Sequence, residues 1–217
     1  MGELIAMNMT HAQAADHLRH EVMDTARFET GRLVAADAPG HFGAVRAIMS
    51  DLDYVAALYY GWDGKRRDKI ATREQTIRFV REVMSVATGD DGYRRWAEHL
   101  YALYRTGLVH LRAPKVLRST RSSTEVLGWA MTYERTDQLS EANGSLPVEH
   151  LHLARTNNTV SHLPVSMKAL FDDFLTTCEY FAREMDAEAK RGEGELLRRW
   201  NQTSNALREP EATTLVW

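Results

Sequence analysis

The sequence predicts a mainly α-helical bundle with a small antiparallel β-meander inserted before the C-terminal helices. At both ends of the chain, apolar residues recur at steps of three and four, the spacing of a helix face that packs on a core. Between residues 125 and 165 they alternate with polar residues instead, with the period of two that strands show. The composition, with 44% hydrophobic and 26% charged residues among 217, is ordinary for a folded domain. We therefore expect a single domain over residues 1–217, divided into a helical part at 10–111, the β-meander at 125–165, C-terminal helices at 166–207 and a loose tail at 208–217.

Helix-breaking residues divide the helical part into four helices. The apolar spacing predicts them at residues 10–36, 42–60, 72–88 and 91–111. Thr10 and Thr72 are suitable N-caps because their side-chain oxygens can accept a backbone N–H of the first turn. Gly89 ends the third helix, and Pro114 ends the fourth near Leu111 because a proline disfavours helical geometry in the residue before it.

The β-meander is predicted from three alternating segments, at residues 125–135, 147–155 and 158–165. Turn-forming residues at 141–145 and 156–158 separate them. A sheet this small does not bury a core of its own, so we expect it to pack against the helices. The helical pattern resumes at 166–191, with Ser166 as the N-cap, and a short helix follows at 195–207.

The segment from Tyr93 to Ser123 carries a strong local positive charge. It holds seven basic residues and one acidic residue, Glu98, so it sums to +6, whereas the rest of this chain of net charge −3 sums to −9. The basic residues are Arg94, Arg95, Arg105, Arg112, Lys115, Arg118 and Arg121. Such a block predicts an anion-binding surface, and the alternative is a solvated face whose charges pair with acids from elsewhere.

Four aromatic residues lie in the same basic segment, namely Tyr93, Trp96, Tyr101 and Tyr104. Aromatic rings beside basic side chains can stack on nucleic-acid bases. Their helical spacing, however, favours packing in the core or across a dimer face.

The stretch "YRTGLVHLRAPK" (104–115) places Arg105 and His110 five positions apart near the predicted end of a helix. In a straight helix, two such side chains point about 140° apart. Gly107 and Pro114 relax this constraint because they weaken and then end the helix. Arginine offers a fork of donors for phosphate oxygens, and histidine exchanges a proton near neutral pH. These are the groups required to cleave RNA without a metal, by promoting attack of the ribose 2′-hydroxyl and stabilising the charge that develops on phosphorus.

The segment "RTGLVH" (105–110) resembles the arginine, four residues, histidine motif of the HEPN superfamily. That superfamily consists of small helical bundles, many of them metal-independent ribonucleases, and others non-catalytic RNA-binding or structural proteins. In the family the motif lies late in a helix, as it does in the helix predicted here. Active members usually carry a polar residue, often Asn or Asp, directly after the arginine, where this chain has Thr106.

The resemblance implies a homodimer in which Arg105 and His110 of two subunits share one cleft. Arg105 would bind the scissile phosphate and His110 would act as general acid or base, with no metal and no cofactor. Secondary contacts to RNA would come from Tyr101, Arg112, Lys115 and Arg118. An antitoxin or another protein is a further partner that fits this hypothesis.

Two alternatives stand beside the ribonuclease hypothesis. The first is a non-catalytic helical scaffold whose basic patch binds RNA or an acidic partner. The second is purely structural: Arg105 forms a salt bridge, Gly107 permits close helix packing, and His110 covers a helix end.

Histidines in the predicted strands raise the alternative of a metal site. His150 and His152 alternate, so they share one face, and His162 on the neighbouring strand can approach them. Three imidazoles can bind zinc, but without a supporting cysteine pair or H-E-x-x-H motif a solvated sheet face is favoured. A bundle metal site from His17, His20 and His99 is disfavoured in the same way.

Acidic pairs at residues 51 and 53 and at residues 172 and 173 do not share a helix face, so they predict no metal-dependent hydrolase. The single cysteine, Cys178, excludes an internal disulfide. No apolar run reaches the roughly 18–20 residues of a membrane span, and the N-terminus lacks the pattern of a secretory signal. We expect a soluble, cytoplasmic protein that makes no membrane contact.

Overall fold

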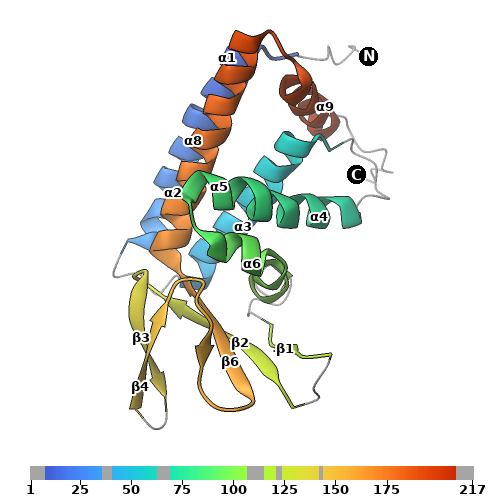
Figure 1. The fold of residues 1–217 in the computed structure, drawn as a ribbon. Coiled ribbons are helices and arrows are strands. Elements are labelled where there is room, and N and C mark those ends of the chain that lie inside the picture. The colour runs from blue at the N-terminus through green and yellow to red at the C-terminus, as the bar shows by residue number, and fades with distance from the viewer. Residues whose placement is uncertain are drawn as a thin grey trace, which may run out of the picture.

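The computed structural model describes residues 8–35, 41–62, 69–106, 115–120, 124–141 and 144–208. Helices make up most of the molecule, and the strands gather at one end of it (Figure 1). The predicted fold class, mainly α with a minor β part before the C-terminal helices, is confirmed. Within the described ranges, no helix combines the length and the apolar character that crossing a membrane requires.

Two long helices lie side by side and run in opposite directions along one edge of the molecule (Figure 1). One is α8 (Met167–Arg191). The other is continuous through α1 (His11–Asp16), the π-helical segment η1 (His17–Met23) and α2 (Asp24–Val34). Arg19 joins them because its guanidinium donates to Glu179 at 3.2 Å and to Asp186 at 2.9 Å.

The caps of these two helices lie where the sequence predicts them. The Thr10 side chain accepts the N–H of Gln13, and the Gln13 side chain accepts the N–H of Thr10, which completes a capping box. The Ser166 hydroxyl accepts the N–H of Ala169 at the start of α8. Gly192 ends α8 with φ of 69°, a left-handed conformation that costs glycine little.

The remaining helices pack against this pair or against one another. They are α3 (His41–Tyr60), α4 (Lys69–Phe79), the π-helical segment η3 (Val80–Met84), α5 (Ser85–Thr88), α6 (Asp91–Leu100), the π-helical segment η4 (Tyr101–Arg105) and α9 (Glu195–Arg208). The helix predicted from Thr72 already begins at Lys69, so Thr72 lies inside it and is not its N-cap. No proline or glycine interrupts residues 69–72, which lets the helix extend backwards. The end predicted near Leu111 and the tail after Arg208 lie outside the described residues.

The sheet is mixed, so the prediction of an antiparallel meander is wrong in its pairing. Its strand order is β1 (Leu117–Arg118), β2 (Val126–Thr132), β6 (Val160–Ser166) and β5 (Ala154–Arg155). β2 and β6 pair in parallel, and β1 and β5 pair antiparallel at the two edges. A parallel pair requires a long crossover connection, which residues 133–159 provide. A separate hairpin, β3 (Thr136–Glu141) with β4 (Gly144–Glu149), lies within that connection.

The segment predicted as a strand at 147–155 is interrupted by a turn. β4 ends at Glu149, β5 begins at Ala154, and Leu151 between them has φ of 57°. A left-handed backbone is rare for a residue other than glycine. The Leu151 N–H donates to the Pro164 carbonyl at 2.9 Å, and the Leu151 side chain is buried in the core, which together hold this turn.

One hydrophobic cluster contains side chains from the helices and from the sheet, so the strands pack against the helices as predicted. Leu163 and Val165 of β6 are buried in the same cluster as Phe174 of α8. The buried Tyr104 hydroxyl of η4 lies 3.0 Å from the Ala130 carbonyl oxygen and 2.8 Å from that of Leu163. It thereby fixes the end of the α6–η4 helix onto the two central strands.

Candidate functional site

The predicted phosphate-binding arginine is held by a carboxylate in the helical bundle. Arg105 Nε donates to Asp53 Oδ2 at 2.5 Å, and the two side chains are 18% and 15% exposed. The hydroxyl of Thr76 donates to the other Asp53 oxygen at 2.7 Å. The salt bridge that the structural alternative expects is therefore present. His110 lies outside the described residues, so its pairing with Arg105 stays a prediction.

The other predicted RNA contacts do not all gather at Arg105. Tyr101 is half-buried in the same π-helical segment, and the guanidinium of Arg73 lies 5.8 Å from its ring centre. Lys115 donates its backbone N–H to the Leu103 carbonyl. Arg118 is exposed on the edge strand β1, and Arg112 lies outside the described residues.

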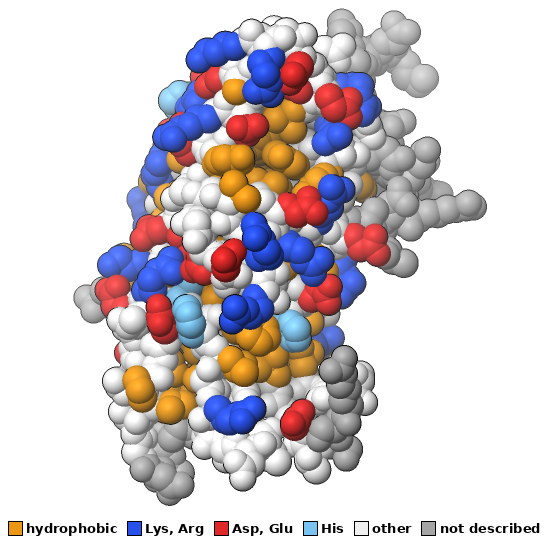
Figure 2. Space-filling model, in the orientation of Figure 1, with side chains coloured by type: hydrophobic (Ala, Val, Ile, Leu, Met, Phe, Trp, Pro, Cys, Tyr) orange, Lys and Arg blue, Asp and Glu red, His pale blue; other side chains and the backbone are white. Residues whose placement is uncertain are grey.

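A groove of about 690 Å³ lies between helix α6 and the four-stranded sheet. The strand register aligns four of its lining residues in one row across β1, β2, β6 and β5, namely Leu117, Leu127, Ser161 and Arg155. Trp96 and His99 of α6 line the groove as well. Their rings meet edge to face, with 5.2 Å between ring centres. Figure 2 shows exposed hydrophobic side chains on this part of the molecule, flanked by basic side chains and by a histidine.

Two ring nitrogens of the groove lack hydrogen-bond partners. Trp96 Nε1 and His99 Nδ1 are both buried, and neither has a partner within the part of the chain that the structure describes. A buried polar atom without a partner costs about 1–3 kcal/mol. Because both atoms are inaccessible to solvent, this cost lies within the packing of α6 and not at the open surface of the groove.

The groove carries two unpaired arginines. Arg118 of β1 and Arg155 of β5 line it and form no ion pair with any described residue. Of the two acids that line it, Glu98 is held by Arg81 at 2.8 Å, and this hydrogen bond lowers the pKa of Glu98. Glu125 is the other. The groove thus combines aromatic rings with positive charge available to an anion.

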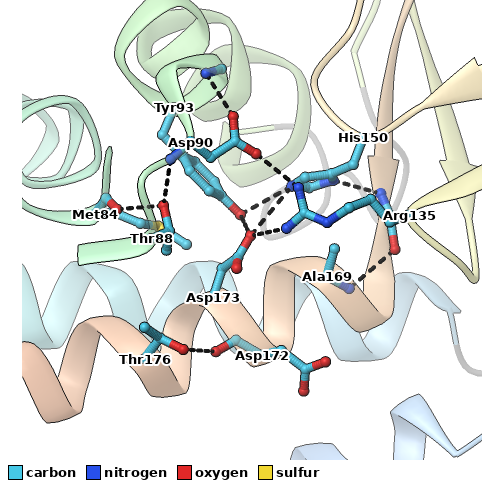
Figure 3. Close-up of polar contacts among 12 residues, drawn as sticks. Met84, Thr88, Asp90, Tyr93, Arg135, His150, Ala169, Asp172, Asp173 and Thr176 are labelled. Atoms are coloured by element: carbon cyan, nitrogen blue, oxygen red, sulfur yellow. Dashed lines mark hydrogen bonds and ion pairs between the residues drawn. The ribbon is translucent and has the colours of Figure 1, made fainter. Parts of the chain in front are cut away.

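A second polar cluster lies deeper, where α6, α8 and the sheet meet (Figure 3). The backbone N–H of Ser166 donates to His150 Nδ1 at 2.9 Å, so the hydrogen of this imidazole is on Nε2. Nε2 lies 3.0 Å from the Tyr93 hydroxyl, which in turn donates to Asp173 at 2.8 Å. Arg135 donates to Asp173 and to Asp90, each at 2.9 Å. Every member of this cluster has its partners.

The deep cluster is a structural joint and not an acid–base or metal site. Asp90, His150 and Asp173 place ligand atoms within 4.8 Å of one another, as a metal site requires. His150 Nε2, however, carries a hydrogen and offers no lone pair, and Arg135 already supplies the positive charge between the carboxylates. Burial lowers the pKa of His150 to about 3 and raises that of Tyr93. Neither group exchanges a proton near neutral pH.

The predicted histidine sets are dispersed. His150 is buried in the deep cluster, His152 is exposed in the turn beside Glu149, and His162 lies 2.9 Å from the Thr156 hydroxyl. His17 contacts Tyr54, His20 contacts Asp24, and His99 lines the groove. Among the described residues, neither histidine triplet forms a group within ligand distance.

The sequence flagged Trp96, His99 and Arg118 but not Arg155 or the deep cluster. Arg155 reaches the groove only through the pairing of β5 with β6, which no local pattern reveals. The deep cluster draws on residues from 90 to 173, so it has no characteristic spacing. A local sequence pattern exists for one member of the cluster. Asp90 is the N-cap of α6, and its side chain accepts the Gly92 N–H at 2.8 Å.

No family model, curated protein or solved structure matches this chain. The fold and the groove of the molecule itself are therefore the evidence for its function.

Proposed function

We propose that this protein binds RNA on the face where helix α6 meets the sheet. The observation that carries the proposal is the groove, in which Trp96 and His99 lie opposite the sheet. Two arginines line it, Arg118 and Arg155, and neither forms an ion pair within the described part of the chain. Arginine forks match phosphate oxygens, and the partly exposed ring of Trp96 can stack on a base, so this combination suits a nucleic acid better than an acidic protein.

Further positive charge lies on helix α6, which forms one wall of the groove. Arg95 is exposed, and Arg94 beside it forms an exposed pair with Asp91 at 3.5 Å. Exposed pairs of this kind contribute little and are easily exchanged for a phosphate. Because phosphate contacts release counterions, we expect affinity to fall as the salt concentration rises.

Cleavage by Arg105 and His110 stays a prediction from the sequence motif. Asp53 already neutralises the charge of Arg105 in a partly buried ion pair, which weakens the attraction of this guanidinium for a phosphate. The proposal is therefore RNA binding, and cleavage is an outcome that the experiment below measures separately.

The test is fluorescence anisotropy of an end-labelled single-stranded RNA of mixed sequence at 50 and 200 mM salt. We expect binding at the lower salt concentration and a loss of about tenfold or more for the double variant Arg118→Ala, Arg155→Ala. Arg191→Ala is the matched control, since Arg191 is exposed at the far end of α8 (Figure 1). Absence of binding at 50 mM salt, or an equal loss in the control, contradicts the proposal.

The same RNAs, incubated with EDTA, report on cleavage. Cleavage by the wild type that leaves cyclic phosphate ends and disappears in His110→Ala would support the ribonuclease hypothesis. Binding without cleavage would support the non-catalytic alternative.

A further inference from the structure

We infer that the groove accepts an unstacked base between Trp96 and the sheet, so that the protein selects single-stranded RNA over duplex RNA. This inference rests on the proposed function and specifies which part of the RNA is recognised. It follows from the volume of the groove, the aromatic and apolar side chains that line it, and the positions of the two arginines.

The walls of the groove suit a flat ring. On one side lies the partly exposed indole of Trp96, held in place by the edge-to-face contact with His99. On the other side, Leu117 and Leu127 present apolar side chains from adjacent strands. Base-on-aromatic stacking tolerates any of the four bases because each has a π-face. A volume of about 690 Å³ lies within the range of small-ligand sites.

The lining of the groove favours a base over a bare phosphate as the occupant. A phosphate gains from the arginines alone, whereas a base also covers the partly exposed Trp96 ring and the apolar side chains of Leu117 and Leu127.

The arginines supply contacts for the RNA backbone near that base. Arg155 of β5 lies in the same cross-strand row as Leu117 and Leu127, so its side chain shares their face of the sheet. A base stacked over this row therefore has the Arg155 guanidinium beside it for a flanking phosphate. Arg118 follows Leu117 in the edge strand β1, so its side chain leaves the opposite face and adds positive charge at the rim of the groove.

A duplex cannot use the groove in this way. Its bases are stacked on both faces and paired along their edges, so insertion requires unpairing and unstacking first. Duplex RNA would contact the arginines alone and bind through its phosphates. The expected result is a preference for single strands that depends on Trp96.

The experiment measures anisotropy of three labelled probes with equal phosphate number: a decauridylate, the same chain with abasic sites throughout, and a duplex. We expect the wild-type protein to bind the decauridylate about tenfold or more tightly than the abasic chain. The variants are Trp96→Leu, which removes the stacking surface, and Trp96→Phe, which keeps an aromatic ring. We expect Trp96→Leu to lose this preference while retaining wild-type affinity for the abasic chain, and Trp96→Phe to keep most of it.

The outcomes separate the inference from the proposed function. Equal affinity of the wild type for the decauridylate and the abasic chain overturns the base pocket but leaves RNA binding intact. If Trp96→Leu lowers the affinity for the decauridylate and for the abasic chain by the same factor, the base pocket is overturned too. If none of the three probes binds, the proposed function fails and the inference with it. The comparison of probes on the wild type requires no variant, so it holds even if Trp96→Leu folds poorly.

Discussion

Helix α6 carries two aromatic residues one turn apart, each in edge-to-face contact with a histidine. Tyr93 meets His150 with 5.7 Å between ring centres, and Trp96 meets His99 at 5.2 Å. In the first pair every polar atom has a partner, and the rings are fully buried. In the second pair a nitrogen of each ring has none within the described residues, and both rings line a groove. Two similar aromatic–histidine pairs on one helix thus differ in role: the first is part of the buried structure, and the second lines a groove. The difference is visible in whether their polar atoms are hydrogen-bonded.

The largest effect that this comparison predicts is at Asp173, the carboxylate at the centre of the deep cluster. Asp173→Ala removes the acceptor of the Tyr93 hydroxyl and one of the two carboxylates bound by Arg135. We expect the free energy of unfolding in urea to fall by about 3 kcal/mol, because buried groups lose their partners. Asp172→Ala is the control, because Asp172 is the neighbouring residue and its exposed side chain lies outside the cluster. We expect this substitution to change the free energy of unfolding by less than about 0.5 kcal/mol. Equal effects of the two substitutions would contradict the assignment of Asp173 to a structural joint.

The next effect is a dependence on pH. The pKa of His150 is about 3 when folded, against an ordinary value of 6.5, so the unfolded chain binds the extra proton first as the pH falls. Below pH 6.5 His150 therefore lowers the free energy of unfolding, by about 1.4 kcal/mol for each pH unit. The measurement is urea unfolding between pH 4.5 and 7.5 for the wild type and for His150→Gln. The variant should show the shallower slope, and identical slopes would contradict the assignment.

Asp51 acts in the opposite sense over part of this range. Burial and the nearby Glu29 raise its pKa from 3.8 to about 6, so the folded chain binds its proton first. Between pH 6 and 3.8 this carboxyl adds stability as the pH falls. The comparison with His150→Gln isolates His150 because Asp51 is present in both proteins.

Removing a single hydroxyl tests the satisfied pair. Tyr93→Phe leaves His150 Nε2–H without its acceptor in a fully buried site. We expect a loss of about 1–2 kcal/mol in the free energy of unfolding. Tyr180→Phe serves as the control, because the Tyr180 hydroxyl has no hydrogen bond to a described residue. A loss at Tyr93 no greater than that at Tyr180 would remove the distinction between the two pairs.

The smallest effect is predicted at the unsatisfied pair. Trp96→Phe deletes more atoms than Tyr93→Phe but also removes a buried N–H that has no partner. The lost apolar contact and the relieved polar cost oppose each other, so we expect a change below about 1 kcal/mol in either direction. Thermal and urea unfolding measure it directly. A loss in the free energy of unfolding larger than that of Tyr93→Phe would mean that Trp96 Nε1 has a hydrogen-bond partner in solution.

Local signals predicted the helices well and the sheet poorly, for physical reasons. Thr10, Ser166 and Gly89 mark helix ends through contacts within a few residues, and those ends are where the sequence places them. The parallel pairing of β2 with β6 joins segments more than 30 residues apart, and no short pattern encodes it. The turn at Leu151 is hidden because the apolar alternation continues through it.

The candidate site was predictable only in part for the same reason. The basic segment and Trp96 are visible in one stretch of sequence, whereas Arg155 joins them through the sheet. Arg105 was visible too, but its partner Asp53 lies on another helix, and this ion pair was not predictable from the spacing of the motif.

The pairing of the first long helix with α8 has a consequence for biosynthesis. Arg19 can form its ion pairs only after Glu179 and Asp186 are synthesised, some 160 residues later. Until α8 emerges, the buried face of the N-terminal helix, including Ala14, Ala15 and Leu18, has no permanent cover. Contacts so distant in sequence close late and slowly. The nascent chain therefore exposes this apolar helix face through most of its synthesis.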